Sequence, residues 1–367
     1  MKLLMISGDR SLASGKAGAF SETIAELCKH FERIDILCPR VQATQQVRVL
    51  HGNVFVHPSS FGLWYQPLWI LKKGRELFQA HHHDIMTVHD YPPFYNGIGA
   101  RLLKRSIGIP AILEIHHIVG WPEASSISET IGRLMTKFFI GRHSRKFDAV
   151  RVVNATVKAT LASWGVVNEK ISVVPSVYLD HAMIESVKNQ EKKFDLVFAA
   201  RLTDNKGLLP LLGSLVLMSG KTLLVIGDGP MRKKAELLAT SLRVSTRVTF
   251  VGWLPTARDV LAGISSGRIF VMNSKSEGNP RVAIEAMALG VPVLATRVGI
   301  MPDVIEDGVN GVFTDGTAKD IAAKASVLLS DLGKLEAMGR EAEKISGRFE
   351  KTAAIKTYAD FLKSLAL

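Results

Sequence analysis

Two carboxylates stand close together in the stretch SKSEGNPRVAIEAMALGVP. Asn279 is typical of a helix N-cap, Pro280 of the first helical position and Gly290 of the position just past the end, so a short helix is expected here. Apolar residues occupy almost every side of this helix, which predicts that it is buried. A buried carboxylate such as Glu285 is costly unless a specific partner binds it, and Glu277 precedes the helix closely. The pattern therefore predicts a binding role for Glu285.

The composition limits the class of protein. A chain of 367 residues, 47% hydrophobic and 22% charged, is typical of a globular protein, and its length favours two domains. Cys28 and Cys38 form neither a disulfide framework nor a metal-ligand pattern, which favours a reducing cytoplasm. The first residues, MKLLMISGDRS, indicate a strand and not a signal peptide, and no apolar run is long enough to span a membrane.

The formal net charge of +12 is compatible with nucleic acid, an anionic membrane surface or phosphorylated substrates as partners. The excess of Lys and Arg is spread over both halves of the chain. No zinc-finger, RNP or basic-zipper pattern occurs, and only 7% of the residues are aromatic. Nucleic acid is therefore the weakest of the three possibilities, and we expect no nucleic-acid partner.

Apolar strands alternate with amphipathic helices in two series along the chain. Strands are expected at Lys2–Ser7, Ile34–Cys38, Asp84–Val88, Ala111–Ile115, Ala149–Val153, Ile171–Val174, Asp195–Ala200, Thr222–Ile226, Arg247–Val251, Ile269–Met272, Pro292–Ala295 and Gly311–Phe313. This alternation predicts an α/β protein with doubly wound parallel sheets. The polar stretch 178–193 separates the series, so we expect Rossmann-like domains at residues 1–177 and 194–345, joined by this linker and facing each other across a cleft.

The carboxyl ends of such strands are where ligands bind. Arg201 follows one strand and Lys206 precedes the next helix, with residues of helix-capping types between them. An arginine, a lysine and a helix N-terminus can bind a pyrophosphate, although two solvated surface charges are the alternative. Gly227 and Gly229 would let the backbone approach a ligand, or simply form a tight turn. Trp253 ends a further strand, where backbone groups could contact a base, and a packed core tryptophan is the alternative.

Glu277 and Glu285, separated by seven intervening residues and followed by AMALGVPVLAT, resemble the E-x7-E signature of the family 4 glycosyltransferases of the GT-B fold. FAARLTDNKG, VIGDGP, FVGWLP and RVGIMPDVIEDGVNGVFTD are similar, in the same order, to further motifs of that family. The resemblance covers nearly the whole chain. It implies two Rossmann-like domains, the first on the acceptor side, with a closing helix in residues 346–367 that crosses back to the first domain.

The resemblance also implies roles for single residues. Arg201 and Lys206 would bind the donor diphosphate, and Glu277 would lie by the donor sugar. Glu285 would accept hydrogen bonds from the ribose hydroxyls of a nucleotide sugar, which would account for a buried carboxylate. The alternative is an ion pair with Arg281, four residues earlier, which would leave Glu285 partly exposed.

Other positions match the family less closely. Gly278 and Asn279 belong to a GNP sequence where the family usually has GFG, which removes one backbone amide from the part that meets the donor sugar. In the first half, IPAILEIHHIVGW places His116 on the family's usual histidine near the reacting sugar, and a core histidine is the alternative. Gly15 and Gly18 stand where the family has a paired-glycine loop close to the phosphates.

Three further stretches attract attention. HHHDIMTVHD contains four histidines, and its triplet is expected at the surface, with metal binding as the alternative. Residues 61–78 and 132–147 mix bulky apolar with basic residues, as do segments that lie on an anionic leaflet. They could equally be core-facing helices with a solvated basic side. Lipid-linked sugar acceptors lie at such a membrane surface.

The sequence thus predicts a hexosyltransferase-type glycosyltransferase that moves a sugar from a UDP or GDP sugar to a glycan or lipid-linked acceptor. The resemblance implies that it is retaining and metal-independent, uses no cofactor, and acts in bacterial cell-envelope or extracellular polysaccharide assembly. It would be cytoplasmic or peripheral on the cytoplasmic face of the membrane. Two alternatives stay open: a GT-B epimerase or phosphorylase, and a catalytically silent sugar-nucleotide or glycan-binding partner.

Overall fold

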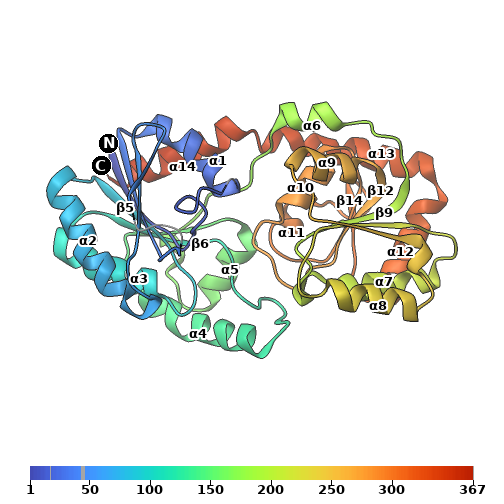
Figure 1. Cartoon of the computed structure of the whole chain (residues 1–367), viewed down its shortest axis with the longest axis horizontal. Coiled ribbons are helices and arrows are strands. Elements are labelled where there is room, and N and C mark those ends of the chain that lie inside the picture. The colour runs from blue at the N-terminus through green and yellow to red at the C-terminus, as the bar shows by residue number, and fades with distance from the viewer. Residues whose placement is uncertain (17, 43–45, 367) are drawn as a thin grey trace. The chain divides into compact units, whose positions relative to one another are not determined.

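A computed structural model describes residues 1–16, 18–42 and 46–366 of the chain (Figure 1). The chain forms two compact units, each with its own sheet and core. The N-terminal unit contains Met1–Val119, Ser128–Ser176 and Thr352–Leu367, and the C-terminal unit contains Gly120–Ile127 and Val177–Lys351. Both units have the α/β class that the alternation of strands and helices predicts.

The N-terminal unit is built on an eight-stranded sheet in the order β3-β4-β2-β1-β5-β6-β7-β8. Its strands are β1 (Lys2–Ile6), β2 (Arg33–Cys38), β3 (Arg48–Leu50), β4 (Val54–Pro58), β5 (Ile85–His89), β6 (Ala111–Ile115), β7 (Ala149–Val152) and β8 (Ile171–Val173). Neighbouring strands are parallel except β3, which is antiparallel to β4. The inner strands are runs of Leu, Ile and Val that are buried on both faces, as expected of a parallel sheet covered by helices.

The helices of this unit, apart from the closing helix, lie between strands along the chain. They are α1 (Ala19–Leu27), α2 (Gln66–His81), α3 (Tyr95–Ile107), α4 (Ile127–Ser144), α5 (Ala155–Ser163) and the closing helix α14 (Lys351–Ser364), with short 3₁₀ turns at Cys28–His30, Leu63–Tyr65 and Asn168–Lys170. No helix within residues 1–16, 18–42 and 46–366 is both long enough and apolar enough to cross a membrane.

The C-terminal unit has a six-stranded, fully parallel sheet in the order β11-β10-β9-β12-β13-β14. Its elements are α6 (His181–Val187), β9 (Phe194–Ala199), α7 (Leu208–Leu217), β10 (Leu223–Ile226), α8 (Arg232–Ser241), β11 (Val248–Gly252), α9 (Ala257–Ser265), β12 (Gly267–Met272), α10 (Arg281–Ala288), β13 (Val293–Ala295), α11 (Met301–Val304), β14 (Gly311–Phe313), α12 (Ala318–Ser330) and α13 (Leu332–Glu343). Helices α7, α8 and α12 cover one face of the sheet and α6, α9 and α10 the other (Figure 1).

The strand order of the C-terminal sheet fixes where a ligand can bind. Strands β10 and β11 lie on one side of β9, and β12, β13 and β14 lie on the other, so the winding direction reverses between β9 and β12. At such a reversal the loops after the two central strands diverge and leave a crevice beyond their carboxyl ends. The segments after β9 and after β12 are the ones that carry the Arg201 and Glu277 motifs.

The buried helix of the opening motif is α10. Its residues Ala283, Ile284 and Ala286 are fully buried against the core that also contains β12, which confirms the prediction of a buried helix. The helix begins at Arg281 with Pro280 as its N-cap, so the assignment of Asn279 as the N-cap was wrong by one residue.

Most strands lie within one or two residues of their expected positions, and two differences are larger. The pair β3 and β4 was not predicted. β3 is a three-residue edge strand with exposed side chains, whereas β4 is a largely buried strand between β3 and β2. The stretch expected to be a linker contains α6, and residues 120–127 join the C-terminal unit although they lie within the first series of strands. Polarity alone does not distinguish a surface helix from a linker.

Candidate active site

Arg201 and Lys206 lie in the segment between β9 and α7. Lys206 ends a 3₁₀ turn, Asp204–Lys206, and Gly207 follows with a φ of +68° and begins α7. A Cβ atom at Gly207 would lie 2.1 Å from the backbone oxygen of Asn273, just past the end of β12. Glycine therefore allows the two loops at the winding reversal to pack in contact.

The capping pattern differs from the expectation. Thr203 heads the 3₁₀ turn but makes no cap through its side chain, and its hydroxyl instead donates to Asn205 Oδ1 at 2.6 Å. The N-cap of α7 is Gly207, so the polar residues before it do not cap this helix. The phosphate binding predicted for this segment would thus depend mainly on the two cationic side chains.

Gly227 and Gly229 lie in the turn after β10 and pack against the Arg201 segment. Cβ atoms at these positions would lie 2.0 Å from the Ala200 oxygen and 2.5 Å from the Leu202 oxygen. Backbone hydrogen bonds join the same two loops, including one from Leu202 N to the Asp228 oxygen at 2.9 Å. The close backbone approach that glycine permits here is between two loops, and donor binding by these glycines stays a prediction.

Glu277 and Lys206 meet after β12 and β9. Lys206 Nζ forms an ion pair with Glu277 Oε1, and Ser274 Oγ donates to the same oxygen at 2.9 Å. Arg201, Lys206, Glu277 and Asn279 line one cavity of about 290 Å³, at the lower end of the range for small-molecule sites. The structure therefore brings two cations and one carboxylate together at the winding reversal.

Glu285 lies in the second turn of α10 and is 9% exposed. Arg281 Nε donates to Glu285 Oε1 at 2.8 Å, and the Arg281 guanidinium lies 5.1 Å from the centre of the Tyr178 ring. The ion pair that was the alternative partner of Glu285 is thus present, but the expectation that it would expose the carboxylate was wrong. The Arg281 side chain is itself only partly exposed, so this ion pair is partly shielded from solvent.

Two further residues predicted to bind the donor, Gly278 and Trp253, lie in loops of the same unit. The turn at Gly299 packs on Gly278, since a Cβ atom at Gly299 would lie 2.3 Å from the Gly278 oxygen. Trp253 follows β11 with 75% of its surface exposed, so the alternative of a packed core tryptophan was wrong. Its contact with a base stays a prediction.

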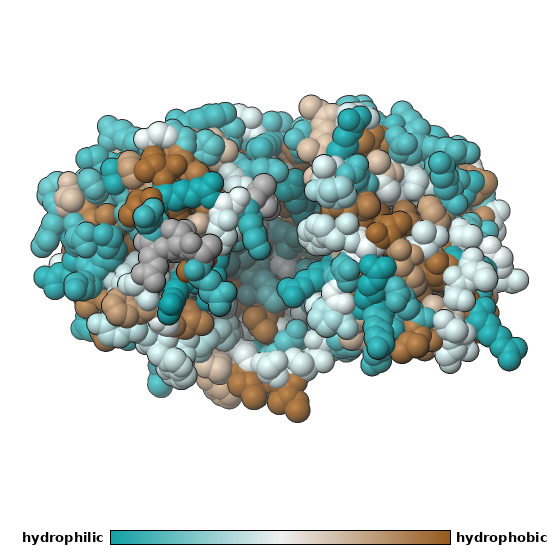
Figure 2. All heavy atoms as spheres, in the orientation of Figure 1, coloured by the Kyte–Doolittle hydropathy of each residue, from teal (hydrophilic) through white to brown (hydrophobic). Residues whose placement is uncertain are grey.

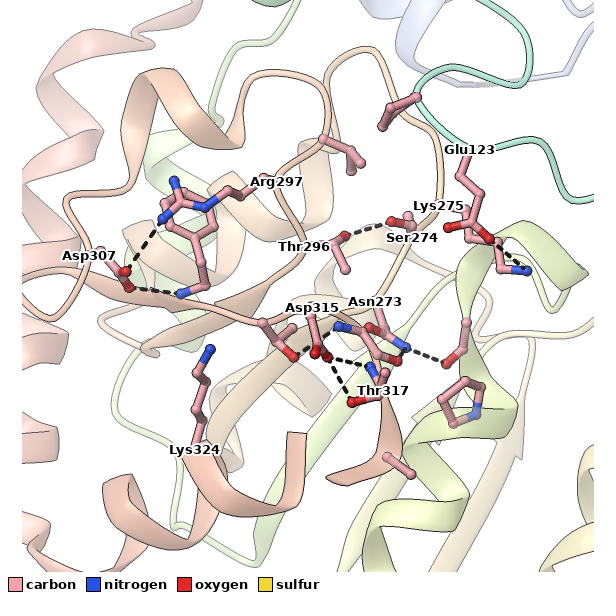
Figure 3. A pocket seen from close by; sticks show the side chains of 18 residues that line it. Glu123, Asn273, Ser274, Lys275, Thr296, Arg297, Asp307, Asp315, Thr317 and Lys324 are labelled. Atoms are coloured by element: carbon pink, nitrogen blue, oxygen red, sulfur yellow. Dashed lines mark hydrogen bonds and ion pairs between the residues drawn. The ribbon is translucent and has the colours of Figure 1, made fainter. Parts of the chain in front are cut away.

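A larger hollow, of about 880 Å³, lies beyond the ends of β12, β13 and β14 (Figure 3). Its cations are already neutralised: Lys275 lies 3.4 Å from the Glu123 carboxylate, and Arg297 lies 3.5 Å from that of Asp307. Asn273 is engaged as well, since its Nδ2 donates to two backbone oxygens. Size alone would favour this hollow. The smaller cavity at Lys206 is favoured because it also contains Arg201, which forms no ion pair with a residue that the structure describes.

His116 follows β6 in the N-terminal unit. Its Nε2 lies 2.9 Å from Glu114 Oε2, and because a carboxylate only accepts, Nε2 carries the proton and Nδ1 is the acceptor of the neutral ring. The ring stacks on His89 at 4.3 Å, and burial, followed by the neighbouring His116, lowers the pKa of His89 to about 3. The His116 side chain is 31% exposed, so the alternative of a core histidine was wrong.

Sequence reasoning missed the network that holds His116. Glu114 is buried, and Arg151 Nη1 donates to its Oε2 at 2.7 Å while Thr87 and Tyr358 donate to its Oε1. Burial raises the pKa of Glu114, but the charge of Arg151 and the hydrogen bond from His116 outweigh it and hold the pKa well below the usual range. The signal available in the sequence was a glutamate inside the apolar strand AILEI.

Gly15 and Gly18 take different parts in the loop after β1. Gly15 has a φ of +72°, whereas Gly18 is extended and is the N-cap of α1, where its N–H donates to Ser21 Oγ at 2.9 Å. They do not form one paired-glycine turn, and Ala17 between them lies outside the described residues. A contact of either with phosphate stays a prediction.

The expectation that the histidine triplet lies at the surface was wrong for His83. This residue is 2% exposed, and its Nε2 lies 2.8 Å from Asp35 Oδ2, a carboxylate that also contacts His57 and Arg33. Within the part of the chain that the structure describes, no three His, Cys, Asp or Glu residues form a group that could hold a metal ion.

The chain is similar to glycosyltransferases along most of its length. Residues 181–345 match the family model described as glycosyl transferases group 1, and residues 15–176 match that of the glycosyl transferase 4-like domain. The lipopolysaccharide core biosynthesis glycosyltransferase LpsE of Rhizobium meliloti is 32% identical over 166 residues, which are 45% of this chain and 48% of the relative. The match thus spans about half the length of this curated relative.

Solved structures share the whole fold. Sucrose-phosphate synthase from Thermosynechococcus elongatus has a TM-score of 0.84 at 16% identity, covering 100% of this chain and 99% of that one. Anabaena HepE in complex with UDP and glucose has a TM-score of 0.76 at 19% identity, covering 100% of both chains. At these identities the likeness shows the fold alone, which is GT-B. With both halves matched to glycosyltransferase models, the chain belongs to the group 1, or family 4, glycosyltransferases.

Proposed function

We propose that the protein is a retaining, metal-independent glycosyltransferase that takes a hexosyl group from a nucleotide-diphosphate sugar. The observation that carries this proposal is the cavity at the winding reversal of the C-terminal sheet, where Arg201, Lys206 and Glu277 converge. Membership of the group 1 family supports it, as does the neighbour HepE, which was solved with UDP and glucose.

The carboxylate of Glu277 forms an ion pair with the ammonium group of Lys206. The diphosphate of an arriving donor would compete with Glu277 for Lys206. The displaced Glu277 carboxylate could then accept a hydrogen bond from a hydroxyl of the donor sugar. Arg201 and Lys206 would then stabilise the negative charge that develops on the leaving diphosphate, and they supply positive charge from the chain itself. Lys206 is thus the residue that couples donor binding to the chemistry.

Transfer with retention breaks the bond between the anomeric carbon and the diphosphate oxygen and forms a bond from the same face to the acceptor oxygen. The acceptor proton goes to the departing phosphate oxygen. The Nδ1 atom of His116 is the free acceptor on the neutral ring, and it would bind a hydroxyl of the reacting sugar. Glu114 fixes that tautomer by accepting from Nε2.

The acceptor we propose is a glycan or a lipid-linked sugar of cell-envelope polysaccharide assembly, the setting named for the relative LpsE. The alternatives differ in what they require. An epimerase would turn over nucleotide sugars without an acceptor, a phosphorylase would need free phosphate, and a silent binding partner would release no nucleoside diphosphate.

Titration of the protein with UDP, GDP and ADP in a metal-free buffer tests the donor assignment. We expect one nucleotide to bind at micromolar concentration, because two cations and a ribose-binding carboxylate are available in the C-terminal unit. Failure of all three to bind would contradict the proposal and favour the silent binding partner.

We also propose a peripheral contact between the N-terminal unit and an anionic membrane. On the exposed side of α4, Ile131, Leu134 and Phe138 repeat at helical spacing, with Phe138 77% exposed, and Lys137 lies beside them. Figure 2 shows apolar residues gathered at the surface over α4. The helix packs on the core through another side, which contains the buried Ile140. The exposed stripe of Ile131, Leu134 and Phe138 is therefore not needed for packing, which favours a role in binding an apolar partner.

The membrane contact predicts binding to vesicles of mixed neutral and anionic phospholipid, and weaker binding to neutral vesicles. The Phe138→Ser variant is expected to have a vesicle partition constant about tenfold lower than that of the wild type, because one large apolar side chain would no longer be buried in the membrane. Co-sedimentation measures this. Val327→Ser, at an exposed position of α12, is the control, and equal losses in both variants would contradict the contact.

A further inference from the structure

The N-terminal unit contains a charged hollow of its own, of about 910 Å³, which no role described so far uses. It lies beyond the carboxyl ends of three adjacent strands, β1, β2 and β4. The loop after β1 contributes Arg10, Ser14 and Lys16, the loop after β2 contributes Arg40, and the segment after β4 contributes Phe61 and Leu63.

The charges of this hollow have one sign. Arg10, Lys16 and Arg40 are exposed, and none of the three forms an ion pair with a residue that the structure describes. No Asp or Glu is among the described residues that line it. The nearby Asp9 carboxylate is used within the loop, where Oδ1 accepts from the N–H of Ser11 at 2.6 Å and from its hydroxyl. Three cations without carboxylate partners around one hollow create a positive potential there, which favours binding of an anion.

The loop that presents two of these cations is held in place. Ser14 N donates to the Arg10 oxygen at 3.0 Å, and Lys16 N donates to the Ser11 oxygen at 2.9 Å, so the loop coils back and brings its two cations to the same hollow. Arg48 Nη1 donates to the Leu12 oxygen at 3.0 Å and attaches the loop to β3. A site whose backbone is fixed in advance loses less conformational freedom on binding.

One wall of the hollow is apolar. Phe61 and Leu63 are both exposed there, and the Phe61 ring packs against that of Tyr65 at 4.6 Å between ring centres. The exposed Trp64 extends this apolar surface along the 3₁₀ turn, Leu63–Tyr65. A ligand that fits both walls carries a multiply charged anion joined to a hydrocarbon.

We infer that this hollow binds the phosphate or diphosphate group of a lipid-linked acceptor, with the first part of the lipid lying on Phe61 and Leu63. The inference rests on the proposed function and narrows its acceptor to phosphorylated lipids. Arg10 and Arg40 would each form bidentate hydrogen bonds to phosphate oxygens, and Lys16 would add a third charge. Inorganic pyrophosphate shares the anion but lacks the apolar part.

Titration calorimetry with geranyl diphosphate, below the concentration at which it aggregates, tests the site in the full chain without nucleotide. We expect binding that is about tenfold or more tighter than that of inorganic pyrophosphate, because the apolar wall contributes. The Arg10→Gln/Arg40→Gln double variant is expected to lose at least about tenfold in affinity for both probes, while its affinity for the donor nucleotide stays unchanged. The matched control is Arg75→Gln/Arg105→Gln, which removes two exposed cations of the same unit.

The outcomes separate this inference from the proposed function. A wild-type protein that binds its nucleotide but not geranyl diphosphate would overturn the acceptor site alone. Equal losses in the two double variants would overturn it as well, and so would a loss of nucleotide affinity in Arg10→Gln/Arg40→Gln, since the cations would then serve the donor. Equal affinity for geranyl diphosphate and pyrophosphate would exclude the lipid. A protein that binds geranyl diphosphate but no nucleotide would support the anion site and contradict the proposed function.

Discussion

Replacing Lys206 with alanine is expected to lower the turnover of the donor nucleotide sugar by about 10²–10³-fold. Lys206 lies in the cavity at the winding reversal, where its ammonium group would meet the leaving diphosphate once the donor displaces Glu277. Its charge is therefore needed most in the transition state, so kcat should fall more than KM rises. Release of nucleoside diphosphate in the presence of acceptor measures the effect.

A second lysine of the same unit is the control. Lys324 lines the larger hollow, and its Nζ lies 3.0 Å from the Asp320 carboxylate, so Lys324→Ala also breaks one lysine–carboxylate pair. We expect this variant to keep the activity of the wild type. If Lys206→Ala retained full turnover, or if both variants lost the same activity, the cavity at Lys206 would not be the site of diphosphate departure.

Replacing Arg151 with methionine is expected to lower the free energy of unfolding of the N-terminal unit by about 3–5 kcal/mol, because the variant leaves the buried Glu114 carboxylate without its main counter-charge. The guanidinium also donates to the Val174 and Pro175 oxygens and lies 3.8 Å from the centre of the Tyr358 ring. Tyr358 belongs to α14, so the loss would also loosen the closing helix. Urea unfolding of the full chain, monitored by a signal from the N-terminal unit, measures the change in the free energy of unfolding.

The exposed Arg145 is the control, and Arg145→Met should change the stability by no more than about 0.5 kcal/mol. The pH dependence gives a second test. Because the pKa of Glu114 is lower in the folded than in the unfolded protein, its contribution is complete above the ordinary glutamate pKa and is lost as pH falls toward the folded value. Arg151→Met should therefore lose less stability to acid than the wild type as pH falls from the ordinary glutamate pKa toward the lower folded value. Similar acid sensitivity in the two proteins would contradict the role of this ion pair.

Much of the fold follows from local patterns. Parallel strands buried on both faces are runs of Leu, Ile and Val, and such runs identified the inner strands other than β4 within one or two residues. The edge strand β3 has no such run, and the assignment of residues 120–127 to the C-terminal unit depends on tertiary packing that no local pattern reveals. The GT-B fold itself followed from the resemblance of ordered motifs.

The candidate site was predictable in its residues and only partly in its pairs. The spacing of Glu277 and Glu285 identified the two carboxylates, and the pair of Glu285 with Arg281 was foreseen as an alternative because both lie one turn apart on α10. The pair of Glu277 with Lys206 depends on how two loops meet. The glycines after β10 were recognised as points of close approach, and the structure shows that the neighbour is a backbone loop. The Glu114 network joins β6, β7 and α14, so only the tertiary structure could bring its members together.

The most direct test of the donor site is a comparison of wild type and Glu285→Gln in calorimetric titrations with UDP, GDP and ADP, first with EDTA and then with Mg²⁺. Glutamine keeps the shape of the side chain but removes the charge that would bind the ribose hydroxyls. We predict that one nucleotide binds the wild type equally well with and without metal, and about 10–100-fold more weakly to Glu285→Gln. The exposed variant Glu336→Gln should bind like the wild type. Unchanged affinity in Glu285→Gln, or no binding to the wild type, would contradict the assignment of Glu285 to the nucleotide-sugar site.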